Sequence, residues 1–279
     1  MVELAERFER QRPALRAVAY RILGSPVEAD DAVQEAWLRL AGVPAGSVDN
    51  LAGWLRTVVT RICLDMLRAR REVPLSPGLP AAGSLEDDAV LAESVSRALL
   101  VVLDRLEPAE RVAFVLHDMY GVPFGQIAPI VSRSPVAAKK LASRARQKVR
   151  GTPLVPAAEL ARRRRVVEAF LAAARAGDLP GVLAVLAPDV VRRCDPRVLA
   201  AGMAAEARGA RAVAEGTVLL GARSRLAEPA LVGGTVGVVV PVGGRLWLAL
   251  TFAIENDKIV AYEVIADPVR LRALDVAVL

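Results

Sequence analysis

The chain has 279 residues and a formal net charge of +6, with 54% hydrophobic and 24% charged residues. This length is enough for two or three domains with substantial cores. No apolar run reaches the ~18 residues that a membrane span needs, and the charged, amphipathic N-terminus lacks the apolar stretch of a signal peptide. We therefore expect a cytoplasmic protein with no membrane partner.

Residues 1–71 are expected to be helical. Residues 25–28 (Ser-Pro-Val-Glu) form a capping box with proline at the first helical position, which predicts a helix that runs to about Leu40. Its exposed side is polar and acidic and carries Asp30, Asp31, Gln34 and Glu35. Because most helices have a charged outer face, this pattern alone fits a solvated surface as well as a binding surface.

The next predicted helix covers about 51–71, with Asn50 as its N-cap. Several arginines and threonines lie near Trp54, and an aromatic side chain among arginines suits unstacked bases and phosphates. A core Trp54 surrounded by solvated arginines fits the same pattern. Residues 72–88 then hold three prolines and two glycines and end in acidic residues, as is typical of an extended linker.

A helix-turn-helix is predicted after this linker. An apolar helix over 124–131 is followed by a turn at 132–135 and by a basic helix, with seven Lys and Arg and no acidic residue between Arg133 and Arg150. An alanine-rich stripe forms its buried side, so its remaining surface is positive. Such a surface suits DNA phosphates, although a solvated basic face remains the alternative. Pro129 lies inside the first helix and is expected to kink or shorten it.

The C-terminal part, 153–279, is expected to be α+β. Helices are predicted over 159–176 and about 180–187, and strands over 235–240, 246–254 and 259–265, which form a curved antiparallel sheet. No nucleophile–base pattern, metal-ligand cluster or phosphate-binding glycine loop is visible, so we expect no catalysis, no metal and no cofactor. Cys63 and Cys194 are interpreted as buried small hydrophobic residues, and His117 as a helix residue near the core.

Two long motifs carry a resemblance to a known family. DDAVQEAWLRL (30–40), followed by WLRTVVTRICLDMLRARR (54–71), resembles region 2 of an extracytoplasmic-function (ECF) sigma factor, and residues 106–150 resemble its region 4. The C-terminal part, with AFLAAARAGDLPGVLAVLAPDVV, is similar to a SnoaL-like domain, a cone-shaped α+β barrel around a pocket. Together they resemble the SigJ-type group of ECF sigma factors, in which the tail tunes activity.

The resemblance implies a role for each set of residues. The acidic helix would dock on the β′ clamp helices of core RNA polymerase through Asp30, Asp31, Gln34 and Glu35. The following helix would melt and read the −10 promoter element through Trp54, Arg56, Thr60, Arg61, Asp65, Arg68 and Arg70. The basic helix would enter the major groove at −35 and contact DNA through Ser134, Val136, Ala137, Lys139, Lys140, Ser143 and Arg144. The more C-terminal Arg146, Lys148 and Arg150 would add affinity that is independent of sequence.

The expected architecture is therefore multidomain: two all-α sigma domains and an α+β SnoaL-like domain. Region 2 would cover 1–71, a linker 72–90, region 4 with its helix-turn-helix 91–152, and the SnoaL-like regulatory domain 153–279. The tail departs from relatives at residues 195–197 (Asp-Pro-Arg), where they carry Asp-Gly-Gly-Gly-Lys. It matches only partly at residues 267–271, where they carry Asn-Pro-Asp-Lys-Leu.

The resulting prediction is an alternative sigma factor that joins core RNA polymerase and directs initiation at specific promoters. Two alternatives stay open at this point. One is a helix-turn-helix transcriptional regulator with a ligand-sensing tail, which leaves the surfaces at 30–35 and 54–71 unexplained. The other is a tail with cyclase-like or isomerase-like activity, because SnoaL-like folds also carry enzymes. The sequence does not identify a small-molecule ligand for the tail.

Overall fold

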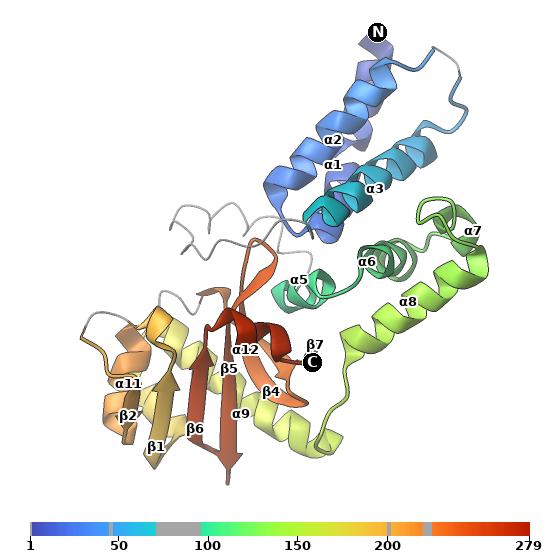
Figure 1. Cartoon of the computed structure of the whole chain (residues 1–279). Helices are drawn as coiled ribbons and strands as arrows, with labels where there is room; N and C mark the ends of the chain where they lie inside the picture. The colour runs from blue at the N-terminus through green and yellow to red at the C-terminus, as the bar shows by residue number, and fades with distance from the viewer. Residues whose placement is uncertain (1, 45–46, 71–95, 200–201, 220–224) are drawn as a thin grey trace. The chain divides into compact units, whose positions relative to one another are not determined.

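A computed structural model describes the chain except for residues 1, 45–46, 71–95, 200–201 and 220–224 (Figure 1). It divides into two compact units, one of residues 1–96 and 103–148 and the other of residues 97–102 and 149–279. The predicted linker 72–90 lies outside the described residues, and the domain boundaries given above stay predictions. None of the described helices combines the length and the apolar character needed to cross a membrane.

Three long helices open the chain: α1 (Val2–Leu23), α2 (Pro26–Ala41) and α3 (Leu51–Arg70). The predicted caps are present, since Ser25 Oγ accepts from the Glu28 amide at 3.4 Å and Asn50 Oδ1 accepts from the Gly53 amide at 2.9 Å. Both predicted helices are thus confirmed. Phe8, Ile22, Val33 and Leu55 are almost completely buried and belong to the core of this part.

The second helical group consists of α5 (Arg97–Asp104), α6 (Pro108–Phe114), the π-helical turn η1 (Val115–Met119), α7 (Phe124–Ile127) and α8 (Pro135–Arg150). Ser134 Oγ accepts from the Ala137 amide at 3.2 Å at the start of α8. The basic helix is confirmed. The apolar helix does not reach the expected 124–131, since α7 ends at Ile127, and this agrees with the shortening expected from Pro129. Pro129 has no N–H to donate, and the chain continues in irregular turns to Arg133. The Arg133 amide donates a hydrogen bond to Ala128 O at 3.0 Å.

The C-terminal part is α+β, as predicted. It contains α9 (Ala157–Ala176), α10 (Leu179–Val185), β1 (Leu186–Cys194), the short 3-10 helix η2 (Pro196–Val198), β2 (Glu206–Arg208), α11 (Ala210–Leu219), β3 (Glu228–Val232), β4 (Thr235–Val242), β5 (Arg245–Glu255), β6 (Lys258–Ile265), α12 (Pro268–Ala273) and β7 (Val276–Ala277). The strand order is β2-β1-β6-β5-β4-β3-β7. Because β1 pairs with β6 in parallel, the sheet is mixed, and the expectation of a purely antiparallel sheet is corrected.

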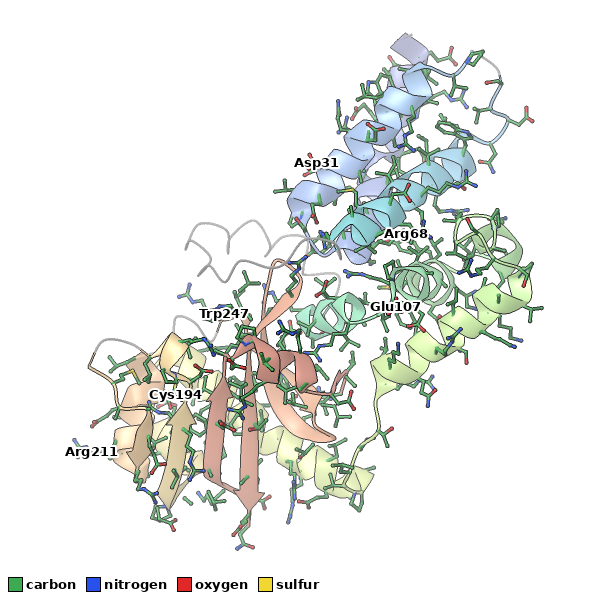
Figure 2. All side chains as sticks on the ribbon, in the orientation of Figure 1. Asp31, Arg68, Glu107, Cys194, Arg211 and Trp247 are labelled. Carbon is green, nitrogen blue, oxygen red and sulfur yellow. The ribbon has the colours of Figure 1, made fainter. Side chains whose placement is uncertain are left out.

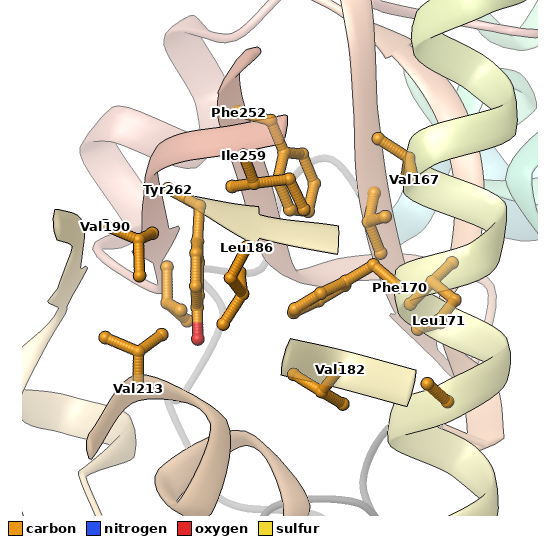
Figure 3. Close-up of a cluster of buried hydrophobic side chains, with 14 of the residues drawn as sticks. Val167, Phe170, Leu171, Val182, Leu186, Val190, Val213, Phe252, Ile259 and Tyr262 are labelled. Carbon is orange, nitrogen blue, oxygen red and sulfur yellow. The ribbon is translucent and has the colours of Figure 1, made fainter. Parts of the chain in front are cut away.

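The main core lies on the face of the sheet that α9, α10 and α11 cover (Figure 3). Phe170 from α9 lies edge-on to Phe252 and Tyr262 of the sheet, with ring centroids 5.6 and 5.5 Å apart. The opposite face is covered over a smaller area by α12, where Leu271 packs on Ala249 and Ile265. Leu248 and Phe252 of β5 and Ile259, Tyr262 and Val264 of β6 belong to the larger core.

Candidate nucleic-acid interface and C-terminal cavity

Helix α8 presents its predicted DNA-reading side to solvent. Ala138, Ala142 and Ala145 are fully buried, and these small side chains let the helix pack closely on its neighbours. The opposite side is exposed and holds Ser134, Val136, Lys139, Lys140, Ser143 and Arg144, with Ala137 half-buried between them. Val136 is 67% exposed. The first two turns of α8 therefore combine exposed cations with an exposed apolar side chain suited to base edges.

The second half of α8 is different, because two of its cations are held by acids of the same unit. Arg146 Nε donates to Asp118 Oδ1 at 2.8 Å, and Lys148 Nζ donates to Glu110 Oε2 at 2.8 Å. Glu110 is only 3% exposed, and Arg144 Nε lies 3.9 Å from its other oxygen. These ion pairs neutralise two cations that were expected to add affinity for DNA, and they attach α8 to α6 and η1.

The four acidic-face residues of α2 are also not equivalent. Asp30 accepts two hydrogen bonds from Arg16, at 2.6 and 2.9 Å, and Glu35 accepts from Arg39 at 2.9 Å. Asp31 (labelled in Figure 2) and Gln34 are exposed, and neither forms a hydrogen bond or ion pair with another described residue. Sequence reasoning assigned no exposed apolar residue to this surface.

Two exposed apolar residues complete that surface. Val27 is 70% exposed and Leu38 is 59% exposed. The positions 27, 31, 34 and 38 follow one another at helical spacing, so Val27, Asp31, Gln34 and Leu38 form a single stripe along α2, which we call the α2 stripe. The i, i+4, i+7, i+11 spacing is the sequence signal that could have identified it. A stripe with a polar centre and apolar ends is suited to packing on a protein partner.

The residues predicted to contact the −10 element fall into two groups. Trp54 and Arg56 are half-buried, whereas Arg61, Asp65 and Arg68 are exposed (Figure 2). Within this unit Arg56 Nη2 donates to Gln126 at 3.3 Å and Arg61 Nη2 to Pro129 O at 3.4 Å. Asp65 accepts from Arg68 at 3.4 Å. All of these are long bonds on solvated side chains, which contribute little to stability.

Thr60 and Arg70 serve the structure of the helical part instead. Thr60 is fully buried and its hydroxyl donates to Arg56 O at 2.7 Å. Arg70 donates to Glu28 at 2.8 Å and to Leu23 O at 2.9 Å, which ties the end of α3 to the connection between α1 and α2. A nucleic acid cannot reach Thr60 in this structure, and Arg70 is committed to the protein.

A cavity of about 90 Å³ lies in the core of the C-terminal part. Its walls are almost entirely apolar and come from α9, α11 and the strands β1, β4, β5 and β6. The polar side chains in the wall are Arg192, Thr217 and Tyr262, and the hydroxyl oxygens of the last two lie 2.8 Å apart. Burial raises the pKa of Tyr262 to about 12, so its hydroxyl stays protonated near neutral pH. Figure 2 labels two more lining residues, Cys194 and Trp247.

Comparison with known proteins identifies the family of the two helical groups. Residues 7–73 match the family Sigma-70 region 2, and residues 96–149 match Sigma-70, region 4. The chain is similar to the probable ECF RNA polymerase sigma factor SigI of Mycobacterium tuberculosis (strain ATCC 25618 / H37Rv), with 35% identity over 281 residues covering 96% of this chain and 94% of the relative. The chain belongs to the ECF sigma factors. Its function is therefore that of an alternative sigma factor.

A second relative of this sigma factor is the ECF RNA polymerase sigma factor SigJ of the same strain, which is 43% identical over 201 residues and covers 68% of this chain and 64% of the relative. The crystal structure of Mycobacterium tuberculosis SigJ is 33% identical in sequence, covers 95% of this chain and 97% of that chain, and superposes with a TM-score of 0.48. The family assignment stands on the full-length sequence similarity.

In this sigma factor the two segments that depart from the expected tail motifs lie together. Asp195 accepts from the Arg197 amide at 3.0 Å and from the Ala266 amide at 3.3 Å, and Arg197 forms an ion pair with Asp267. Asp267 also caps α12 through the Val269 and Arg270 amides at 3.0 and 2.9 Å. Residues 195–197 and 267–271 thus form one small polar cluster.

The cysteines and the histidine of the sigma factor are structural in the described part of the chain. Cys63 and Cys194 are both buried and not disulfide-bonded, as expected, and burial raises the pKa of the Cys63 thiol to about 12. His117 Nδ1 lies 3.1 Å from Val122 O, and its ring stacks on Phe124 at 4.0 Å. Among the described residues, no group of three or more His, Cys, Asp and Glu could hold a metal ion.

Proposed function

We propose that this sigma factor, working in the cytoplasm, docks on core RNA polymerase through α2, melts the −10 element with α3 and anchors at −35 with α8. Sigma factors supply promoter recognition while the polymerase carries out the chemistry. The observation that carries the proposal is the division of charge along α8: Lys139 and Lys140 in its first half are exposed and form no ion pair with a described residue, whereas Arg146 and Lys148 in its second half are paired with acids.

The −35 contacts are assigned to the exposed side of the segment from Ser134 to Arg144, at the start and middle of α8. Recognition helices usually reach base edges with their N-terminal residues, and flanking cations position the backbone. Lys139 and Lys140 are exposed and have no ion-pair partner among the described residues. Ser134, Val136, Ala137, Ser143 and Arg144 complete this set, whereas Arg146 and Lys148 are assigned to holding α8 in place.

For the −10 element we retain the exposed and half-buried members of the α3 set. Arg61, Asp65 and Arg68 are exposed, and Trp54 and Arg56 are half-buried. A phosphate competes well with the long hydrogen bonds of Arg56 and Arg61, because charge-assisted contacts of arginine with phosphate are stronger than those with neutral acceptors. We leave out Thr60 and Arg70 because of their burial and their commitment within the protein.

For the polymerase we assign the α2 stripe. Its apolar ends would pack on the β′ clamp helices, and Asp31 and Gln34 would supply polar contacts between them. An interface of this kind gains most from buried apolar side chains at its centre or ends and less from exposed charges. Asp30 and Glu35 are already paired with arginines, so they contribute less than Asp31.

The test is a binding measurement with purified core polymerase. The double variant Asp31→Ala/Leu38→Ala should weaken binding by about tenfold or more, as expected for loss of a contact worth roughly 1.4 kcal/mol. The control is Glu215→Ala/Leu219→Ala on α11, which also removes one exposed acidic and one exposed leucine side chain from a helix face, four residues apart rather than seven. Equal affinities for the two variants, with unchanged circular dichroism, would rule out docking through α2.

The C-terminal domain is proposed to modulate this activity without a catalytic role. A general acid or base needs a pKa near the working pH, whereas burial raises the pKa of Tyr262 in the cavity to about 12. Carboxylates on nearby strands and helices, such as Glu206 and Glu263, are paired with arginines. This arrangement favours binding of a small molecule over turnover of a substrate.

A further inference from the structure

The cavity of the C-terminal domain contains a buried positive charge. Arg192 lies on β1 between Val190 and Cys194, which point to the same face of the sheet. It is only 3% exposed and lines the cavity. Nearly all other lining side chains are apolar, including Phe170, Leu248 and Val264. A charge in such surroundings is normally paired, since an isolated ion is strongly disfavoured there.

The guanidinium of Arg192 is only partly satisfied by the protein. Its Nη2 donates to Ala204 O at 2.9 Å. Its Nε and Nη1 are buried and have no hydrogen-bond partner among the described residues. Arginine keeps its positive charge inside proteins, so these N–H groups are charged donors that lack an acceptor.

The acids on the neighbouring elements are paired elsewhere. Glu206 on β2 binds Arg193 and Arg208, Glu263 on β6 binds Arg270, and Glu215 on α11 binds Arg211. Residues 200–201 and 220–224, which the structure does not describe, contain no aspartate or glutamate in the sequence. Arg192 itself forms no ion pair with any residue that the structure describes.

The chain also leaves space for the guanidinium. Gly216 lies inside α11, where glycine is less favourable than alanine. A Cβ atom at this position would lie 2.5 Å from Arg192 Nη1 and 3.3 Å from the Met203 methyl group. The absence of a side chain at 216 thus permits Arg192 to stay in the cavity wall.

We infer that the C-terminal cavity binds a small monocarboxylate with an apolar body. The carboxylate would accept a charge-assisted hydrogen bond from one of the two unpartnered nitrogens of Arg192, Nε or Nη1, and the hydrocarbon part would contact Phe170, Leu250 and the other apolar lining residues. The cavity is smaller than the ~150 Å³ apolar cavity that is known to hold benzene. A short-chain acid of about the size of butyrate is therefore the expected class of ligand.

The inference is tested with butyrate and butyramide, which have nearly the same shape but differ in charge. The full-length protein with labelled Val and Leu methyl groups is titrated with each compound and followed by NMR. Butyrate should shift methyl signals of Val238, Val264 and Leu250 and saturate, while butyramide should bind at least about tenfold more weakly. Equal binding of the two compounds, or shifts confined to surface methyl groups, would overturn the inference.

Two variants make the result specific to the cavity. Arg192→Met removes the charge and should raise the melting temperature of the ligand-free protein, because a buried ion without a partner destabilises the folded state. In this variant butyrate should bind no better than butyramide. Ala174→Leu fills the cavity from α9 and leaves Arg192 in place, so butyrate binding should also disappear. Retention of selective butyrate binding in either folded variant would show that the anion binds elsewhere.

Discussion

Glu110 on α6 is a buried carboxylate that forms ion pairs with cations in the second half of α8. Lys148 Nζ lies 2.8 Å from one of its oxygens and Arg144 Nε 3.9 Å from the other, while both cations remain more than half exposed. A buried carboxylate is costly to desolvate unless it is paired, so these contacts are required for the charge to stay buried. The cations of α8 therefore have two different roles that depend on their nearest acid.

Replacing this carboxylate with an amide should loosen α8. Glu110→Gln keeps the shape but places a neutral group against Lys148, and we expect a loss of about 1–3 kcal/mol in stability of this helical part. The measurement is hydrogen–deuterium exchange of the α8 amides together with thermal denaturation. Asp118→Asn is the matched control, because its partner Arg146 forms a more exposed pair, and the loss should be below about 1 kcal/mol. Equal effects of the two changes would contradict this account.

Single residues also show what the sequence could and could not predict. Val190, Arg192 and Cys194 alternate with the period of a strand that has one buried face, so the burial of Arg192 could be predicted from its apolar neighbours. The partners of Arg146 and Lys148 could not be predicted from the sequence, because Asp118 and Glu110 lie 28 and 38 residues earlier in the chain. Charge pattern predicts which face of a helix is polar, whereas the pairing of each charge depends on packing.

At the scale of elements, α8 is a positive helix whose second half is partly neutralised by Asp118 and Glu110, and the proposal assigns DNA contacts to its unpaired lysines. Each lysine that contacts a phosphate releases about one counterion on binding, which lowers affinity as salt rises. Lys140→Ala should therefore weaken promoter binding and reduce the log–log salt slope by about one. Binding is measured by fluorescence anisotropy on a promoter duplex from low to moderate salt.

The comparison for this prediction is Arg146→Ala. Asp118 already neutralises Arg146, and its hydrogen bond raises the pKa of the arginine, so Arg146 stays charged and paired with Asp118. The salt slope should change less in this variant than in Lys140→Ala. A slope that is unchanged by Lys140→Ala, or equally reduced by both, would remove Lys140 from the phosphate contacts.

Among the elements, those with strong periodicity were predicted best. The bounds of α2, α3, α8 and α9 differ from the predicted ones by only a few residues, because capping residues and long amphipathic stripes mark them. The strands β2 and β7 have three and two residues, too few for a pattern to be visible. The parallel pairing of β1 with β6 joins segments about 70 residues apart, and residue periodicity carries no information on which strand lies beside which.

At the scale of the whole molecule, promoter recognition and the C-terminal cavity belong to separate stretches of the sequence. Both family matches end by residue 149, and every residue assigned to polymerase or DNA precedes the C-terminal domain. The cavity is lined by residues between Phe170 and Val264. A ligand in the cavity can therefore influence transcription only if the C-terminal domain alters how the helical regions engage polymerase or DNA.

Run-off transcription with core polymerase separates these roles. A chain truncated after residue 152 should start transcription at the same position as the full chain, because the sigma regions are retained, but its yield should differ by about twofold or more if the tail modulates initiation. Butyrate should change the yield of the full chain and should leave both the truncated chain and the Arg192→Met variant unaffected. Loss of start-site selection on truncation would instead make the C-terminal domain part of promoter recognition, and equal yields with and without the tail would remove its regulatory role.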